Sequence, residues 1–501
     1  MQSVPDMLTN AAKRFATRRS VTDGTHAHTF EQTHERATRL ATALLDEGLR
    51  PGDRLALLAY NEIEYTEIQV ACQRAGFVLV PMNYRLAEAE LAYLVDDSRP
   101  AALITGSEFA QVGANLDVPR KYHLTDEGTG TPYEELLAAG RPPGSTPAAA
   151  IDASAPCTIL YTSGTTGRPK GAVLTNLALW ARQCSFVAEV AAPPGSVFLQ
   201  CLPLFHIASN LGYSFTSTGS TNLFMRQFDA NQFFELLENE RPTHILLVPT
   251  MINMLLNHPG IERADFSSVE MVLYGASSIS PDVLAQAIDV MECDFLQFFG
   301  MTESSGCSIL RPADHDPVGH PERLASCGTD AVGFETMVVD DTDTEVARGE
   351  VGEVITRGPA LMSGYWNNEE ASADALRNGW MHTGDLGHRD ADGYIFITDR
   401  KKDMVVSGGE NVYPREVEDV LYAHDAVFEA AVIGLPDERW GERVHAVVVL
   451  HDGAEADGDA LSAFARERLA SYKVPRTFSF VDELPKNATG KILKTELRAQ
   501  H

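Results

Sequence analysis

The sequence predicts an α/β protein with a large N-terminal body and a small α+β lid at the C-terminal end. The body should contain several subdomains, with mixed or parallel sheets flanked by helices and a β-rich subdomain, because 501 residues exceed one ordinary domain. Helix and strand signals alternate through the first 110 residues, short strands dominate Val332–Arg357, and a compact unit begins near Arg400. We place the body at residues 1–400 and the lid at residues 401–501.

Helical and extended patterns alternate in the first part of the chain. Apolar residues recur at helical spacing in three segments: Thr29–Gly48, Ile63–Ala75 and Leu86–Asp97. Short apolar runs typical of buried strands accompany them: Arg54–Ala59, Val78–Pro81 and Ala101–Thr105. This alternation indicates βαβ units with parallel strands.

The pattern resumes after residues 140–155, a segment rich in Pro, Gly, Ala and Ser that we expect to be a loop. The next strands are expected at Thr243–Val248 and Val269–Tyr274, with helices at Asn231–Glu240 and Pro281–Met291. In the lid, helices are expected at Pro414–His424 and Asp459–Leu469, and strands at Phe428–Ile433 and Val444–Leu450.

The composition argues against several classes of function. A formal net charge of −30 opposes binding to nucleic acid or to an anionic membrane. No apolar run reaches the roughly 18 residues that suggest a membrane-spanning helix, and the first residues lack the layout of a signal peptide. We therefore expect a cytoplasmic protein. The seven cysteines form no CxxC pair, so we expect core thiols rather than zinc ligands.

Lysine is scarce and unevenly placed. Six of the nine lysines follow residue 400, and Lys170 lies at the end of a glycine-rich segment. Since arginine supplies most of the positive charge, these positions suggest a need for a flexible point charge. Chance clustering on a solvated face is the alternative.

The strongest local motif is the segment Tyr161–Gly171, which follows the apolar run Thr158–Leu160. It carries four hydroxyl side chains besides the tyrosine, two internal glycines and Lys170 near its end. Backbone N–H groups, hydroxyl donors and a mobile cation are the groups that bind polyphosphate. The spacing is not that of a Walker A loop. Composition alone leaves an ordinary solvent loop equally open.

This segment resembles the signature loop of the adenylate-forming (ANL) superfamily, which includes acyl-CoA synthetases, peptide-synthetase adenylation domains and luciferases. Further motifs of the superfamily follow in the same order: Pro203–His206 at the substrate gate, Gly275–Ser277 at the adenine turn, Phe299–Glu303, Thr383–Asp385 at the ribose, Asp399–Asp403 at the hinge with Ser407–Asn411 after it, and Pro485–Lys491. The resemblance covers nearly the whole chain. It is to the acyl-CoA synthetases, the AMP-dependent acid–thiol ligases, in particular.

The resemblance implies a set of residues that bind ATP and AMP: Thr162, Ser163, Gly164, Thr165, Thr166, Gly167, Lys170, Gly275, Ala276, Ser277, Phe299, Gly300, Thr302, Asp385 and Arg400. Thr302 would donate to the α-phosphate and Phe299 would stack on adenine. Asp385 and Arg400 would bind the ribose. Glu303 would hold Mg²⁺, which shields the phosphates.

The resemblance assigns catalytic roles to Lys491, Thr302, Glu303 and His206. Lys491 would stabilise the negative charge that builds as the carboxylate attacks the α-phosphorus. His206 and Phe205 would border the carboxylate site and the thiol channel. His206 is not assigned as a general base.

The resemblance also implies that the lid is mobile. It should rotate about Lys402 between the two half-reactions, which withdraws Lys491 and brings Gly408 and Gly409 toward the thiol channel. Two residues without side chains suit the passage of a slender thiol arm, although a plain tight turn explains them equally well.

The acyl pocket is placed by the resemblance at eight positions: Phe205, His206, Ala208, Tyr213, Met251, Tyr274, Ser277 and Gly300. Small residues at Ala208 and Gly300 leave room for a ring or a medium chain. The set contains no cation and no acidic residue, which argues against a second carboxylate and against an amino-acid substrate. Ser278 departs from the family pattern after the adenine turn, so the pocket floor should be reshaped.

The resemblance therefore implies ATP-dependent activation of an aryl or medium-chain acid to an acyl-adenylate, then transfer to the thiol of CoA. The implied cofactors are ATP, Mg²⁺ and CoA. A free-standing enzyme that loads the phosphopantetheine of a carrier protein in trans uses the same motifs and stays open. Arg439, Arg443, Lys473 and Arg476 are candidate contacts for the 3′-phosphate of CoA. A non-catalytic nucleotide-binding relative is the alternative from another class, and a homodimer is left open.

Overall fold

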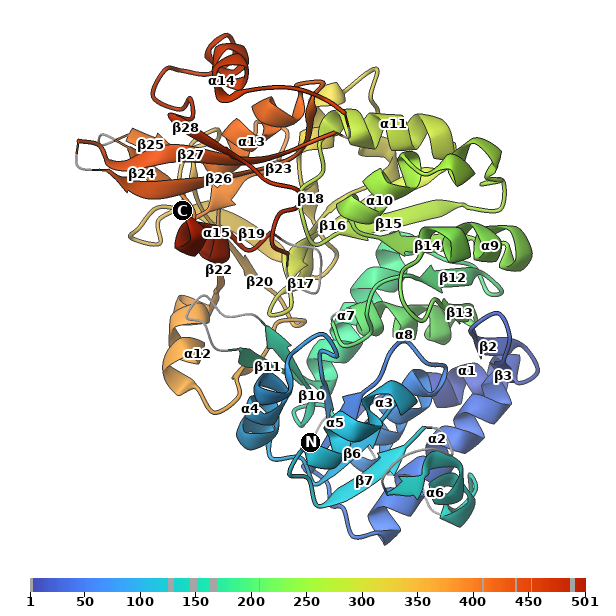
Figure 1. The fold of residues 1–501 in the computed structure, drawn as a ribbon. Coiled ribbons are helices and arrows are strands. Elements are labelled where there is room, and N and C mark those ends of the chain that lie inside the picture. Colours follow the sequence, from blue (N-terminus) through green and yellow to red (C-terminus); the bar gives the residue numbers. More distant parts are fainter. Residues whose placement is uncertain are drawn as a thin grey trace.

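The computed structural model describes residues 3–124, 130–144, 151–162, 169–206, 208–407, 410–437, 439–451, 453–486 and 492–501. The chain forms a large α/β body, and a smaller unit of strands and helices from the C-terminal end packs at one end of it (Figure 1). This arrangement confirms the predicted fold class. The predicted boundary at residue 400 stays a prediction, although the strands change sheets between Arg400 and Val405.

The first sheet is built from the alternating segments at the start of the chain. Its strands run in the order β21-β11-β10-β5-β4-β6-β7-β8. Their bounds are Gly364–Tyr365, Lys170–Thr175, Pro156–Thr162, Val78–Pro81, Arg54–Leu58, Ala102–Thr105, Arg120–His123 and Thr131–Pro132. The pairs β4–β5, β4–β6 and β6–β7 are parallel, as the alternation predicts.

The first helices follow from local signals in the sequence. Their bounds are Met7–Phe15 (α1), Phe30–Asp46 (α2), Glu64–Ala75 (α3), Glu88–Ser98 (α4), Ala110–Asn115 (α5) and Tyr133–Ala139 (α6). Helix α2 starts with a reciprocal capping box, in which Thr29 accepts from the backbone of Gln32 and the Gln32 side chain accepts from Thr29 N–H. Its apolar stripe, which includes Leu40 and Leu44, packs in the main core of this region with Ile68 of α3.

The second sheet carries the strands that position the site. Its order is β18-β17-β16-β15-β14-β12-β13-β2-β3. The bounds are Thr329–Asp330, Ser305–Leu310, Asp294–Met301, Met271–Gly275, His244–Leu247, Val197–Gln200, Thr221–Phe224, Arg19–Thr22 and Ala27–Thr29. From β16 to β2 the neighbours are parallel, whereas β17 returns antiparallel to β16. The carboxyl ends of the parallel strands therefore meet along one edge.

The helices of this region connect or cover these strands. Their bounds are Asn176–Val190 (α7), Ala208–Thr218 (α8), Ala230–Glu240 (α9), Pro249–Leu256 (α10) and Pro281–Met291 (α11). Strands β14 and β15 and helices α9 and α11 confirm the four elements predicted between residues 231 and 291. Helices α7 and α8 pack against each other between the first two sheets (Figure 1).

Two further sheets follow. The third contains β19 (Glu335–Val339), β20 (Gly352–Arg357), β22 (Met381–Arg389) and β23 (Ile395–Arg400), with α12 (Glu369–Ala375) beside it. The lid sheet contains β24 (Val405–Ser407), β25 (Glu410–Val412), β26 (Val427–Asp437), β27 (Gly441–Leu450) and β28 (Thr477–Phe480). Its helices are α13 (Pro414–Tyr422), α14 (Gly458–Arg466) and α15 (Lys494–Gln500). The predicted lid elements are thereby confirmed.

Two expectations need correction. The segment 140–155 is not loop throughout, because Ile151–Asp152 form β9, which pairs with β1 (Ser3–Val4) and packs Ile151 against Val4. The cysteines are mostly buried, but Cys184 is exposed and Cys293 is half-buried, so they are not all core thiols. Over the ranges that the structure describes, no cluster of side chains suits a metal ion, and no helix is long and apolar enough to cross a membrane.

A buried ion pair in the lid gives a prediction about stability. Lys494 Nζ lies 2.7 Å from Glu418 Oε1, and both side chains are largely buried. Burial acts to lower the pKa of Lys494, but the charges of Glu418 and Asp399 outweigh it and raise that pKa. Lys494→Met leaves two carboxylates uncompensated and should lower the free energy of unfolding by about 3 kcal/mol in urea denaturation.

Arg468→Met is the control from the same unit, because its pair with Glu467 is solvent-exposed. We expect a loss below about 1 kcal/mol for that variant. Equal losses for the two variants would contradict a special role for the buried pair.

Candidate active site

A cavity of about 830 Å³ lies at the carboxyl ends of β12, β14, β15 and β16. Its walls include Pro203 after β12, Val248 after β14, Gly275 at the end of β15 and Gly300 in β16. Arg400 and Lys402, at the predicted hinge, reach the same space. In parallel sheets this edge is where ligands usually bind, so the cavity is the candidate active site.

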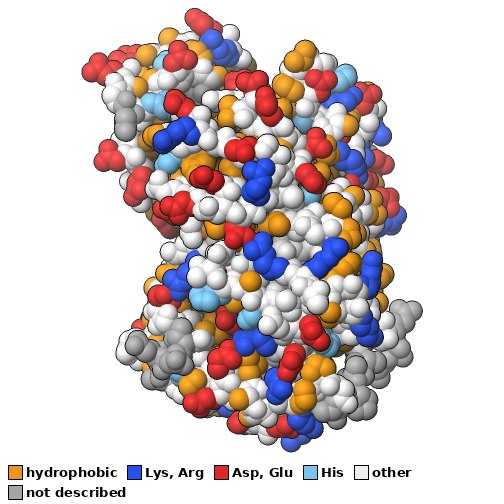
Figure 2. Space-filling view, turned by 90° about the vertical axis from the view of Figure 1, so that its right-hand side faces the viewer, with side chains coloured by type: hydrophobic (Ala, Val, Ile, Leu, Met, Phe, Trp, Pro, Cys, Tyr) orange, Lys and Arg blue, Asp and Glu red, His pale blue; other side chains and the backbone are white. Residues whose placement is uncertain are grey.

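The protein surface is largely acidic, so positive charge in the site must be placed locally. Acidic side chains are spread over the upper and lower parts of the face in Figure 2, with basic side chains among them. The cavity itself is lined by cations from several segments: Arg85, Lys170, Arg182, Arg377, Arg400, Lys401 and Lys402. This set suits an anionic ligand.

Glu303 is one of two buried carboxylates in the cavity wall, the other being Glu353. Glu303 is 4% exposed, and its Oε1 accepts from Tyr365 Oη at 2.8 Å and from Thr162 Oγ1 at 3.4 Å. Burial and the charge of Glu303 raise the pKa of Tyr365, so this hydroxyl stays protonated and donates. Lys170 Nζ lies over the Tyr365 ring, 5.3 Å from its centroid. Tyr365 therefore contacts both Lys170, the lysine of the predicted phosphate loop, and Glu303, the predicted metal ligand.

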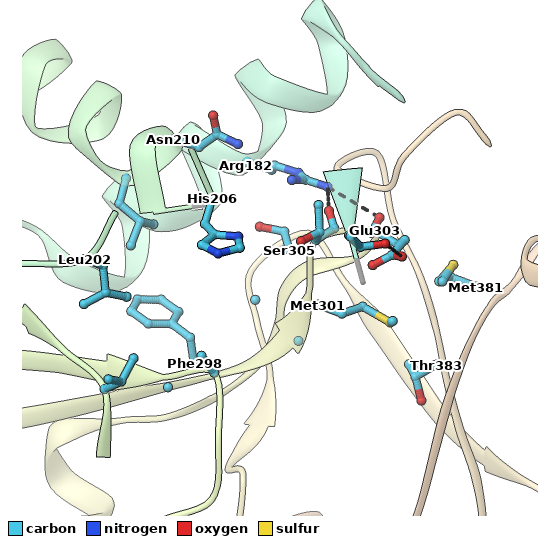
Figure 3. Close-up of a pocket in the computed structure, with 18 of the residues that line it drawn as sticks. Arg182, Leu202, His206, Asn210, Phe298, Met301, Glu303, Ser305, Met381 and Thr383 are labelled. Atoms are coloured by element: carbon cyan, nitrogen blue, oxygen red, sulfur yellow. Dashed lines mark hydrogen bonds between the residues drawn. The ribbon is translucent and has the colours of Figure 1, made fainter. Parts of the chain in front are cut away.

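Arg182 of α7 is a site residue that the sequence reasoning missed. It is 4% exposed, and its Nε donates to the Ala360 carbonyl at 2.8 Å. Its Nη2 donates to the carbonyls of Thr302 at 3.0 Å and Glu303 at 3.4 Å (Figure 3). Burial lowers its pKa to about 10, so the guanidinium is charged at neutral pH. It holds the Thr302–Glu303 segment against α7.

Two close backbone approaches explain the glycines at the ends of β15 and β16. A Cβ at Gly275 would lie 2.4 Å from the Phe298 carbonyl oxygen, and one at Gly300 would lie 1.6 Å from that of Ser305. No other residue fits either position without moving the backbone. The turn after Gly300 is further held by Met301 N–H, which donates to Ser304 Oγ at 3.1 Å.

The cavity brings many of the predicted site residues together. Those in its wall are Thr162, Lys170, His206, Met251, Tyr274, Gly275, Ala276, Gly300, Thr302, Glu303, Arg400 and Lys402. Some predicted residues lie outside the described ranges: Ser163, Gly164, Thr165, Thr166, Gly167, Gly408, Gly409 and Lys491, together with the side chain of Ala208. Their roles stay predictions.

Other predicted residues lie away from the cavity wall. Tyr213 packs with Leu8 and Phe30 in a separate core, because the helical repeat turns it to the side of α8 that faces α1. Phe299 packs against Val338 and Val354. The alternation of side chains along β16 places Phe298, instead of Phe299, in the cavity wall.

Phe205 is also buried outside the wall, edge-on to Tyr84 with ring centroids 5.0 Å apart. Ser277 is exposed beyond the turn that follows Gly275. The assignment of Phe205, Ser277 and Tyr213 to an acyl pocket therefore differs from the placement in the structure.

The predicted ribose pair is already joined. Arg400 Nε lies 2.9 Å from Asp385 Oδ1, and the two residues face each other across β22 and β23. Arg400 lines the cavity, whereas Asp385 lies behind it, 7% exposed. Burial lowers the pKa of the neighbouring Lys402.

His206 is neutral in this structure. Burial, with a contribution from the charge of Arg85, lowers its pKa to about 4. Its ring stands against Phe205, with centroids 4.3 Å apart, and its Nε2 has no partner among the described residues. At neutral pH, His206 therefore offers a hydrogen bond to a carboxylate but no charge.

The class of the protein follows from comparison with known families. Residues 8–366 match the AMP-binding enzyme family, and residues 416–491 match the AMP-binding enzyme C-terminal domain. The chain therefore belongs to the AMP-binding enzyme family. This confirms the resemblance inferred from the motifs and the prediction of an AMP-forming ligase.

Individual relatives agree with this class. The chain is 40% identical over 483 residues to a feruloyl-CoA synthase of Amycolatopsis sp, covering 96% of this chain and 95% of the relative. It is 37% identical over 486 residues to the fatty acid–[acyl-carrier-protein] ligase ScoC of Streptomyces coeruleorubidus, covering 94% and 91%. The structure resembles the amide bond synthetase McbA from Marinactinospora thermotolerans, with a TM-score of 0.91, 31% identity and 99% of both chains covered.

The Tyr365–Glu303 contact yields a prediction. Tyr365→Phe removes the nearer donor to Glu303 and should lower kcat/KM for pyrophosphate release about tenfold, because a hydrogen bond to a charged group contributes about 1.5–3 kcal/mol. Tyr394→Phe is the matched control, since its hydroxyl donates to Asp314, which does not line the cavity. An unchanged rate in Tyr365→Phe would contradict a role for this contact.

Proposed function

We propose that the enzyme uses ATP to activate a carboxylic acid and then transfers the acyl group to the thiol of CoA. A carboxylate oxygen attacks the α-phosphorus, the bond to the bridging oxygen breaks, and pyrophosphate leaves. The thiol sulfur then attacks the carbonyl carbon, AMP leaves with the carboxylate oxygen, and the thiol proton goes to solvent. The observation that carries this proposal is that one cavity joins Thr302, Glu303 and the Gly275–Ala276 turn to Lys402, the predicted hinge residue.

The body residues would bind and orient the nucleotide. Thr302 is held by Arg182 at the cavity wall and would donate to the α-phosphate. The Gly275–Ala276 turn leaves backbone open to adenine, and Arg400 would reach the ribose. These are positioning and charge effects, which phosphoryl-type transfer mainly requires.

Glu303 fits the part of a magnesium ligand. Mg²⁺ usually takes one or two carboxylates from the protein and completes its shell with phosphates and waters. The buried Glu303 carboxylate, oriented by Tyr365 and Thr162 at the cavity wall, would provide such a ligand. When bound, the ion would neutralise phosphate charge and favour loss of pyrophosphate.

CoA is the better supported acceptor because of an aromatic and basic patch on the lid. Arg439 and Arg476 lie over the ring of Trp440, with the guanidinium carbons 4.7 and 4.3 Å from its centroid. Such a patch suits the adenine and 3′-phosphate that CoA carries and a pantetheine arm alone lacks. Lys473, by contrast, already forms an ion pair with Glu416, in which Nζ lies 2.6 Å from Oε1. The similarity to a carrier-protein ligase keeps a carrier protein as the second candidate.

The lid would alternate between two positions. We propose that Lys491 approaches the carboxylate for the first step and that rotation about Lys402 then admits the thiol past Gly408 and Gly409. This division explains why a single cavity can serve two successive reactions.

The adenylation step is tested by pyrophosphate release with a panel of aryl and medium-chain acids, followed by detection of the thioester with CoA or a carrier protein. Lys491→Ala should lower the rate of adenylation by about 10²-fold or more while nucleotide binding persists, because one preorganised cation stabilises the transition state. Lys486→Ala is the control from the same motif, since Lys486 is paired with Glu429 at 2.6 Å. Full activity in Lys491→Ala, or no pyrophosphate with any acid, would refute the proposal.

A further inference from the structure

Helices α7 and α8 give the cavity a polar wall. Arg182 and Ser185 of α7 and Asn210 and Ser214 of α8 line it, all buried. Figure 3 shows Arg182, His206 and Asn210 above the cavity, with Phe298 and Met301 below. Most of the remaining wall around this part is apolar: Leu202, Phe228, Val248, Met251, Phe298 and Ile309. One wall of this part of the cavity therefore carries hydrogen-bonding groups, and most of the remaining wall is apolar.

Three polar atoms of this wall have no hydrogen-bond partner among the described residues. They are Arg182 Nη1, Asn210 Nδ2 and Ser214 Oγ. The residues that carry these atoms are buried: Arg182 and Asn210 are each 4% exposed, and Ser214 is 2% exposed. Gln69 donates to Asn210 Oδ1 at 3.5 Å, which turns the amide so that Nδ2 is its unpaired end. All three atoms can donate, and a buried donor left unpaired is unfavourable.

The charge of Arg182 points in the same direction. Its described contacts are to three backbone carbonyls, and no carboxylate forms an ion pair with it in the part of the chain that the structure describes. The charge of Glu303 acts on Arg182, but its carboxylate accepts no hydrogen bond from the guanidinium, so Nη1 can still donate to an electron-rich oxygen nearby. The Thr302 and Glu303 carbonyls both accept from Nη2, so Nη1 is left to donate to an oxygen of a ligand.

We propose that the acyl group of the substrate carries an oxygen hydrogen-bond acceptor that Arg182, Asn210 and Ser214 receive, so that the enzyme selects oxygenated acids over hydrocarbon acids of the same shape. This rests on the proposed function and narrows its substrate class. The eight positions implied by the resemblance include no cation, whereas Arg182 lies in the cavity wall. A plain alkyl chain would leave all three donors unpaired.

Paired acids of nearly equal volume test the proposal. Some pairs are ring acids in which a methyl group is replaced by a hydroxyl group, or an isopropyl group by a carboxylate, at each ring position in turn. A further pair is a medium-chain acid and its keto analogue. The oxygenated partner of at least one pair should have a kcat/KM for pyrophosphate release at least about tenfold higher, because a site built to hydrogen-bond a substrate rejects the analogue that lacks the group. Preference for hydroxyl or keto identifies a neutral oxygen, and preference for carboxylate an anionic one.

Variants of α8 assign the preference to the wall. Asn210→Leu and Ser214→Ala should each reduce the ratio of oxygenated to hydrocarbon kcat/KM about tenfold, mainly by raising KM for the oxygenated acid. Ser217→Ala is the control on the same helix, because its hydroxyl donates to the Ser214 carbonyl within α8 and does not line the cavity. Its ratio should match that of the parent enzyme.

The outcomes separate this proposal from the one on which it rests. Pyrophosphate release that is equal or faster with the hydrocarbon partner of every pair overturns the selection of oxygenated acids but leaves acid activation intact. A preference that survives in both α8 variants also overturns it, since the wall would not be its source. Absence of pyrophosphate with every acid refutes the proposed function itself.

Discussion

One buried guanidinium holds the active-site region together. Arg182 stands in the middle of α7 and donates to carbonyls at Thr302, Glu303 and Ala360, which come from segments more than a hundred residues away in the chain. Loss of these bonds would remove the Arg182 donor from the Thr302 and Ala360 carbonyls, at a cost of about 1–3 kcal/mol each. The Glu303 carbonyl would keep the bond that Met362 N–H donates at 2.8 Å. The position of Glu303, and through it the contacts of Tyr365 and Lys170, depends on this anchor.

The same residue links the architecture to the chemistry. The parallel strands of the second sheet bring Gly275 and Gly300 to one edge, where their backbones pass too close to neighbours for any side chain. Arg182 lines the same cavity, and Arg400 and Lys402 at the predicted hinge reach it as well. In the proposed reaction, nucleotide, acid and thiol meet in this one cavity, and we propose that the polar wall of α7 and α8 selects the acid.

The fold and part of the candidate site could be predicted because they depend on local pattern. The period of apolar residues placed α2, α9, α11 and the parallel strands within a few residues, and short motifs located Glu303, Arg400 and Lys402. The rest depends on tertiary contacts. Phe298 and Phe299 are adjacent and alike in sequence, and only the pleat of β16 decides which one faces the cavity. In the sequence, Arg182 is indistinguishable from an ordinary polar residue of a helix. Its role becomes visible only from the three carbonyls, distant in the chain, to which it donates.

In the proposed reaction, the acid is joined to AMP through its own carboxylate oxygen. The most direct test supplies the acid with ¹⁸O in the carboxylate, completes the reaction with ATP and the thiol, and weighs the AMP by mass spectrometry. The account predicts that each AMP formed carries one ¹⁸O atom taken from the acid. AMP without the label would contradict attack at the α-phosphorus and, with it, the role given to the cavity.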